Sequence, residues 1–141
     1  MPYMEAVYDV LEKNHGKVIY FDFWARWCPP CLTEMEPLKQ LRSKFSTNDL
    51  IIYSICVSEP KEQWEECLNE YSLKNCGIEC VHVTDYLGID NYQKIRKQWK
   101  IDRIPYYILI NRKGQIIDFG ATARPSNPQL VSRIEDAVNS K

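Results

Sequence analysis

The stretch WARWCPPCLTEMEP, residues 24 to 37, places two cysteines around two prolines and directs the interpretation of the whole chain. Cys28 and Cys31 follow an apolar run, beginning at Val18, that is rich in β-branched and aromatic residues and predicts a buried strand. Cysteines at this spacing can form a static disulfide, half of a metal site, or a redox pair that opens and closes. The rest of the sequence has to discriminate among these three.

Strands and helices are expected to alternate on both sides of this stretch. The expected elements are a helix at 3–13, a strand at 16–25, a helix at 31–45, a strand at 50–57, a helix at 60–72 capped by Ser58, a short strand at 79–84, a helix at 91–101, a hairpin at 105–120 around the turn NRKG, and a last helix with Asn127 as N-cap and Pro128 at its first position. This order predicts an α/β domain with a mainly parallel sheet covered on both faces.

Composition excludes several classes of function. The chain has 141 residues, which suits one domain, and its net charge of −1 argues against nucleic acid or an anionic membrane as the main partner. No apolar run approaches the roughly 20 residues that a membrane span needs. Residues 1–17 do not resemble a signal peptide, so we expect a cytosolic chain or a domain of a longer exported one. Six cysteines favour an oxidising compartment.

The chemistry of the two cysteines follows from their expected places. Cys28 ends a strand and precedes a helix, where unpaired N–H groups stabilise a thiolate. Such positions lower the pKa of a thiol from about 8.5 to roughly 3.5–7.5, which makes Cys28 the expected nucleophile. Cys31 lies further into the helix and suits the resolving role. Pro29 and Pro30 have a fixed φ and no N–H, and so keep the loop rigid.

Two other interpretations of the cysteine pair are weaker. A static disulfide across two residues closes a very short loop and therefore stabilises little. A haem attachment site needs a histidine after the second cysteine, where this chain has Leu32. Zinc needs two further ligands, which Cys76, Cys80 or His82 would have to supply from a distant part of the sequence.

Together, FDFWARWCPPC and IDRIPYYILINRKGQI resemble the thioredoxin superfamily. In the second stretch Ile104–Pro105 precedes a strand and hairpin, as the cis-proline of that family does. The resemblance covers residues 17–140 and implies a thioredoxin fold: three α/β/α layers, a central mixed sheet, a helical insert near 58–90, and a C-terminal hairpin plus helix. The whole chain, 1–141, is then one domain, with an N-terminal helix at 1–16.

Within the superfamily, the chain most resembles the TlpA/ResA-like thiol–disulfide oxidoreductases of bacterial cell envelopes. The long insert, the acidic Glu34 and the ending GATARPSNPQL are similar to that group, the ending especially to domains of larger exported Bacteroides-type proteins. Two features depart from the pattern. Pro37 stands six residues after the second cysteine where five is usual, and the Pro-Pro tip resembles that of tryparedoxins and nucleoredoxins.

The resemblance implies a role for each site residue. Cys28 attacks a partner disulfide, and Cys31 resolves the mixed disulfide. Asp22 matches the buried acidic residue that shuttles a proton to or from the second cysteine, which agrees with the raised pKa expected of a carboxyl group in an apolar strand. The alternative for Asp22 is a carboxylate turned to solvent. Glu34 is expected to share this work, to tune the thiols, or to be an exposed helix residue.

The expected client-binding residues surround the cysteine pair: Trp27, Pro29, Ile104 and Pro105. Trp24 either frames the site or packs in the core. Cys56 is expected to be an inert core residue. For Cys67, Cys76 and Cys80 a second disulfide remains open.

The sequence therefore predicts a thiol–disulfide oxidoreductase that reduces protein disulfides without a metal or organic cofactor. Its expected partners are a disulfide-bearing client protein and an upstream thiol reductant, and it is expected to be a monomer. The expected location is the bacterial periplasm or cell envelope, with the cytoplasm as the alternative. A thiol-dependent peroxidase and a non-enzymatic metal-binding or partner-binding module are the competing functions.

Overall fold

A five-stranded mixed sheet organises the chain in the computed structural model, which describes residues 10–58, 60–86 and 88–140. The strand order is β3-β2-β1-β4-β5. The central strand β1 pairs in parallel with β2 and antiparallel with β4; β3 is parallel to β2, and β5 is antiparallel to β4. The strands are β1 Val18–Trp24, β2 Leu50–Cys56, β3 Glu79–His82, β4 Tyr106–Ile110 and β5 Ile116–Phe119.

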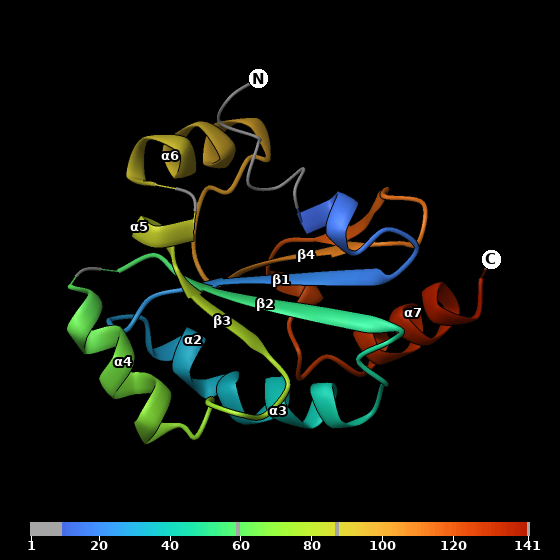
Figure 1. Ribbon diagram of the computed structural model, residues 1–141, viewed down its shortest axis with the longest axis horizontal. Helices are drawn as coiled ribbons and strands as arrows, with labels where there is room; N and C mark the ends of the chain where they lie inside the picture. The colour runs from blue at the N-terminus through green and yellow to red at the C-terminus, as the bar shows by residue number, and fades with distance from the viewer. Residues whose placement is uncertain (1–9, 59, 87, 141) are drawn as a thin grey trace.

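Helices cover both faces of this sheet, as the sequence predicted. Figure 1 shows α2, α3 and α4 on one side and α6 on the other. The helices are α2 Pro29–Thr33, α3 Met35–Ser43, α4 Lys61–Glu70, α5 Val83–Tyr86, α6 Ile89–Gln98 and α7 Pro128–Asn139, with a 3₁₀ turn at Ala121–Ala123. Residues 10–13 are helical, and the rest of the helix expected at 3–13 lies outside the described residues.

The central strand is buried on both faces because its side chains alternate between two cores. Val18 and Tyr20 pack in one core with residues of α3 and α7. Ile19, Phe21 and Phe23 pack in the other. The parallel strands, the antiparallel hairpin and the two covered faces make the α/β thioredoxin architecture that the sequence predicted.

The single helix expected at 31–45 is wrong, because the segment forms two helices. The first starts at Pro29 and ends at Thr33, and the second starts at Met35. Pro37 explains the break: it has no N–H to donate to the carbonyl of Thr33, four residues earlier, and its ring crowds that carbonyl. The proline that departs from the family pattern thus divides the helix and leaves Glu34 at the junction.

Three smaller expectations differ in detail. The strand expected at 79–84 ends at His82, and the chain continues as the short helix α5. Ser58 is not the N-cap of α4; Pro60 occupies that position, and the Ser58 hydroxyl accepts a hydrogen bond from the Arg26 N–H at 3.0 Å. Asn127 is confirmed as the N-cap of α7, since its side chain accepts from the N–H of Gln129 at 3.1 Å.

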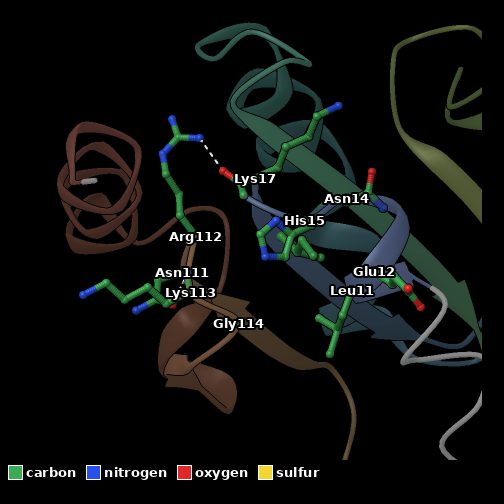
Figure 2. A pocket seen from close by; sticks show the side chains of 11 residues that line it. Leu11, Glu12, Asn14, His15, Lys17, Asn111, Arg112, Lys113 and Gly114 are labelled. Carbon is green, nitrogen blue, oxygen red and sulfur yellow. Dashed lines mark hydrogen bonds between the residues drawn. The ribbon is translucent and has the colours of Figure 1, made fainter.

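Arg112 connects three segments of the chain at the end of the sheet where β1 begins. Its guanidinium donates to the carbonyls of Gly16 (2.8 Å) and Val138 (2.8 Å) and pairs with Asp49 (3.0 Å). Figure 2 shows Arg112 beside a pocket of about 380 Å³ at this end. The cysteine pair follows the opposite end of β1, so this pocket is remote from it. Within the described residues, no helix is long and apolar enough to cross a membrane.

Candidate active site

Cys28 and Cys31 form a disulfide at the point where β1 gives way to α2. Their Cα atoms are 5.3 Å apart. Cys28 is the N-cap of α2, with an extended backbone, and its sulfur accepts a hydrogen bond from the N–H of Cys31 at 3.3 Å. An N–H donor stabilises a thiolate at that sulfur more than a thiol. This donor is one of the unpaired N–H groups that the sequence led us to expect at the start of the helix, although α2 has only five residues.

The disulfide is buried, whereas the residues next to Cys28 in the chain are exposed. Cys28 is 4% and Cys31 2% exposed. By contrast, Trp27 is 68% exposed, and Pro29 and Pro30 are also exposed. A reacting partner therefore meets Trp27 and the prolines before it reaches the sulfur atoms.

A groove beside Trp27 extends to Ile104, the residue before the expected proline. The Ile104–Pro105 peptide bond is cis, as the resemblance implied. The groove has a volume of about 430 Å³, and Ile104 lines it together with Trp27. Ile104 also packs against the buried cluster that holds both cysteines. The structure thus brings two of the predicted client-binding residues, Trp27 and Ile104, to one groove, and Pro105 follows Ile104 in the chain.

Asp22 is buried in β1 and does not turn to solvent. The pKa of its carboxyl group is raised to about 8, mainly by burial and less by the nearby Glu34, while a hydrogen bond from Ser54 opposes the shift. The Ser54 hydroxyl lies 3.4 Å from Oδ2 of Asp22. Side chains alternate along β1, so Asp22 faces the same side of the sheet as Trp24, which packs with Cys28 and Cys31. A carboxyl group with this pKa can exchange protons near neutral pH.

Glu34 is also buried, so the exposed alternative does not hold. It lies at the junction of α2 and α3, where its own N–H donates to the carbonyl of Cys31 at 3.2 Å. Its carboxylate accepts the backbone N–H of Ser126 at 2.8 Å and the Ser126 hydroxyl at 2.7 Å. Glu34 is therefore a fixed charge between the cysteine helix and the segment before α7.

Sequence reasoning missed Ser54 and Ser126. Ser54 pairs with Asp22 across β1 and β2, and each is a polar residue within an apolar strand. That coincidence is a signal that could have linked them, since buried polar groups need partners. Ser126 carries no such signal, because its contact with Glu34 joins positions 92 residues apart.

A cluster that we call the site core lies behind the disulfide. It contains Trp24, Ala25, Cys28, Cys31, Met35, Cys56, Trp64, Cys67, Leu68 and Leu73. Trp24 is fully buried there, so it packs in the core at the site. Cys56 and Cys67 are buried free thiols, and Cys76 and Cys80 are half-buried free thiols. No second disulfide joins these four, so the bridge that the sequence left open is not formed.

The geometry does not favour the zinc alternative. His82 engages both ring nitrogens with backbone groups: Nε2 lies 2.7 Å from the carbonyl of Ser58, and Nδ1 accepts the N–H of Thr84 at 3.2 Å. Across residues 10–58, 60–86 and 88–140, no group of three or more histidine, cysteine or acidic side chains is arranged to hold a metal.

Comparison with known proteins identifies the family of this chain. The family model described as Redoxin matches residues 5–138, nearly the whole chain. The chain belongs to the Redoxin family. Among solved structures, this Redoxin chain is similar to a candidate thiol-disulfide oxidoreductase from Bacteroides vulgatus, with 34% identity, a TM-score of 0.69, and coverage of 89% of this chain and 76% of the other.

Two further proteins are similar to this chain, one in sequence and one in fold. The thiol-disulfide oxidoreductase ResA of Bacillus thuringiensis (strain Al Hakam) is 26% identical over 108 residues, which are 77% of this chain and 57% of the relative. This Redoxin chain therefore spans little more than half the length of the curated relatives it matches. The thioredoxin domain of a thiol-disulfide oxidoreductase from Bacteroides vulgatus shares the fold, with a TM-score of 0.75, 23% identity, and coverage of 92% and 84%. The TlpA/ResA-like resemblance is confirmed.

Proposed function

We propose that this chain is a thiol–disulfide oxidoreductase that reduces disulfides in client proteins. The observation that carries the proposal is the Cys28–Cys31 disulfide itself, placed at the start of α2 with the Cys31 N–H pointing at the Cys28 sulfur. That donor favours the thiolate of Cys28 once the pair is reduced. A groove lined by Trp27 and Ile104 lies beside it to receive a client segment.

The first step uses the reduced chain. The Cys28 thiolate attacks one sulfur of the client disulfide, a new S–S bond forms, and the client S–S bond breaks. The leaving client sulfur departs as a thiolate and takes a proton from water. Chain and client are then joined through Cys28.

The second step releases the client. Asp22 accepts the proton of the Cys31 thiol, and the Cys31 thiolate attacks the sulfur of Cys28. The bond between Cys28 and the client breaks, and the client sulfur leaves as a thiolate that takes a proton from water. The client then has two thiols, and the chain holds the Cys28–Cys31 disulfide. Both electrons come from the cysteine pair, and the scheme therefore requires no metal or organic cofactor. Glu34, held by Ser126, adds a smaller contribution to the raised pKa of Asp22, which burial mainly causes.

The scheme implies two kinds of partner. One is a client protein with an accessible disulfide, and the other is an upstream thiol reductant that regenerates the Cys28–Cys31 dithiol. We place this exchange outside the cytoplasm. The support for that location is the resemblance to the TlpA/ResA-like thiol–disulfide oxidoreductases of bacterial cell envelopes.

Trapping tests the proposal. The Cys31→Ser variant of the reduced chain, mixed with a disulfide-bonded protein such as insulin, is expected to accumulate a mixed disulfide through Cys28. The Cys28→Ser variant is expected to form none, and the unmodified chain is expected to reduce insulin catalytically when dithiothreitol supplies electrons. Turnover of hydrogen peroxide without insulin reduction would instead assign a peroxidase, and trapping at a cysteine other than Cys28 would contradict the mechanism.

A further inference from the structure

A second pair of thiols lies at the edge of the sheet. Cys80 belongs to β3, and Cys76 lies in the loop that leads into that strand. The Cys76 sulfur donates to the carbonyl oxygen of Leu73 at 2.9 Å, and the Cys80 sulfur donates to the same oxygen at 3.7 Å. Both sulfur atoms therefore lie within contact distance of the same carbonyl oxygen.

The two thiols have different surroundings. The side chain of Arg42 passes under this loop: its Cδ lies 3.4 Å from the point where a Cβ on Gly77 would stand, and its guanidinium donates to the carbonyls of Leu50 (2.5 Å) and Phe45 (2.9 Å). The charge of Arg42 interacts favourably with the thiolate of Cys76. Cys80 differs, because burial, with a smaller effect from the neighbouring Cys76, raises the pKa of its thiol to about 12. Cys76 lies beside the positive charge of Arg42 and Cys80 is the more buried thiol, so Cys76 is the expected attacking sulfur and Cys80 the expected resolving one.

We propose that Cys76 and Cys80 are a second redox-active pair, which closes into a disulfide by exchange with a low-molecular-weight disulfide such as oxidised glutathione. The shared contact with Leu73 and the asymmetry between the thiols carry this inference, which does not rest on the proposed function. The arrangement repeats the logic of a thiol pair in which one sulfur attacks and its buried neighbour resolves.

The exchange balances in two steps. The Cys76 thiolate attacks oxidised glutathione, a bond forms between Cys76 and one glutathione, and the other glutathione leaves as a thiolate that is then protonated. Cys80 then loses its proton to water and attacks the Cys76 sulfur, which releases the second glutathione. Two protein thiols and one oxidised glutathione thus yield one protein disulfide and two glutathione thiols. Closure withdraws both donors from the Leu73 carbonyl and ties the loop to β3.

Closure of the Cys76–Cys80 disulfide would also affect the packing at the Cys28–Cys31 site. Leu73 is a member of the site core, and Cys80 packs against that core. The state of the second pair is therefore expected to alter the packing behind the Cys28–Cys31 pair, without any exchange of electrons between the two pairs.

The sequence permits a direct test on the intact chain, because trypsin places each pair in its own peptide. Residues 27–39 hold only Cys28 and Cys31, and residues 75–94 hold only Cys76 and Cys80. The fully reduced chain is incubated with oxidised glutathione, and its remaining thiols are alkylated with N-ethylmaleimide. It is then digested with trypsin, and the peptide masses are measured by mass spectrometry. Peptide 75–94 is expected to lose both N-ethylmaleimide adducts and to appear two hydrogen masses lighter than its dithiol form. Peptide 27–39 serves as the internal control for oxidation.

Two variants test the order of attack. Cys80→Ser is expected to retain glutathione on Cys76, because the resolving thiol is absent. Cys76→Ser is expected to leave Cys80 available to N-ethylmaleimide after unfolding, with no glutathione attached. Cys67→Ser is the matched control, and its peptide 75–94 is expected to close as in the unmodified chain. Full alkylation of peptide 75–94 when peptide 27–39 has closed would overturn the proposal, and so would a bridge from Cys76 to Cys67.

Discussion

Ser126 holds both carboxylate oxygens of Glu34, its backbone N–H at 2.8 Å from Oε1 and its hydroxyl at 2.7 Å from Oε2. Glu34 sits where α2 meets α3, three residues after Cys31, and Ser126 lies just before α7. The junction that ends the cysteine helix is therefore fastened to a segment 92 residues away. The carboxylate is buried, and its two hydrogen-bond donors offset the free-energy cost of removing it from water.

Ser126→Ala is expected to destabilise the fold by roughly 1–3 kcal/mol, because a buried carboxylate oxygen loses its hydroxyl donor while the backbone donor remains. Urea unfolding measures the change. Ser132→Ala is the matched control, since Ser132 is exposed on α7 and alanine suits a helix. Equal stability of the two variants would show that the hydroxyl of Ser126 contributes nothing.

Asp22 should make the stability of the chain depend on pH. Its folded pKa of about 8 lies above the value of 3.8 for a free carboxyl group. Between these values the folded state keeps a proton that the unfolded state has released, so the free energy of unfolding falls as pH rises. The slope approaches about 1.4 kcal/mol per pH unit within this window, and the contribution levels off above about pH 8.

Urea unfolding of the unmodified chain and of Asp22→Asn, from pH 4 to 9, measures this contribution. The amide that replaces the carboxyl group cannot ionise and can still accept a hydrogen bond from Ser54, so the variant is expected to gain stability over the unmodified chain as pH rises. Parallel stability curves across that range would contradict a raised pKa at Asp22.

The same substitution should slow one chemical step selectively. If Asp22 takes the proton of Cys31, Asp22→Asn slows release of the client from the mixed disulfide by roughly 100-fold. Formation of the mixed disulfide through Cys28 is expected to keep its rate. In the unmodified chain, release should accelerate as pH rises towards about 8, where Asp22 becomes the carboxylate that accepts the proton. Rapid-mixing kinetics separates the two steps, and an equal loss in both would reduce Asp22 to a structural role.

Trp27→Ala should affect clients and leave the fold intact. Trp27 is 68% exposed, so its loss is expected to change stability by no more than about 0.5 kcal/mol. As an exposed aromatic side chain beside the groove, it offers contact area to a client, and kcat/KM for a protein disulfide is expected to fall about tenfold, or about 1.4 kcal/mol. The rate with a small aromatic disulfide serves as the control and should not change. A parallel loss with both substrates would place Trp27 in the chemistry of the cysteines.

Much of the fold was predictable because local signals agreed with long-range packing. The apolar runs at β1 and β2, the turn at residues 111–114 and the Asn127 cap each carry a local physical reason, and each lies where it was predicted. The sequence contains Pro37, yet the prediction of one helix at 31–45 missed the break between α2 and α3. Its cause is the missing N–H four residues after Thr33, which the periodicity of apolar residues does not reveal.

The site was predictable in part for the same reason. Cys28, Cys31 and Ile104–Pro105 are marked by motifs, and Asp22 is marked by its place in an apolar strand. Ser126 and the Leu73 carbonyl that the second thiol pair shares are set by how distant segments fold together. No local pattern encodes those contacts, so only the three-dimensional arrangement shows them.

The reduction potential of the Cys28–Cys31 pair tests the central claim most directly. The intact chain is equilibrated with reduced and oxidised dithiothreitol at graded ratios, quenched with N-ethylmaleimide, and the thiols of peptide 27–39 are counted by mass. A single reversible two-electron transition near the reducing end, at about −270 mV, is the predicted result for a chain that reduces client disulfides. A transition near −120 mV would mark an oxidant that makes disulfides, and the absence of any reversible transition would contradict the redox account altogether.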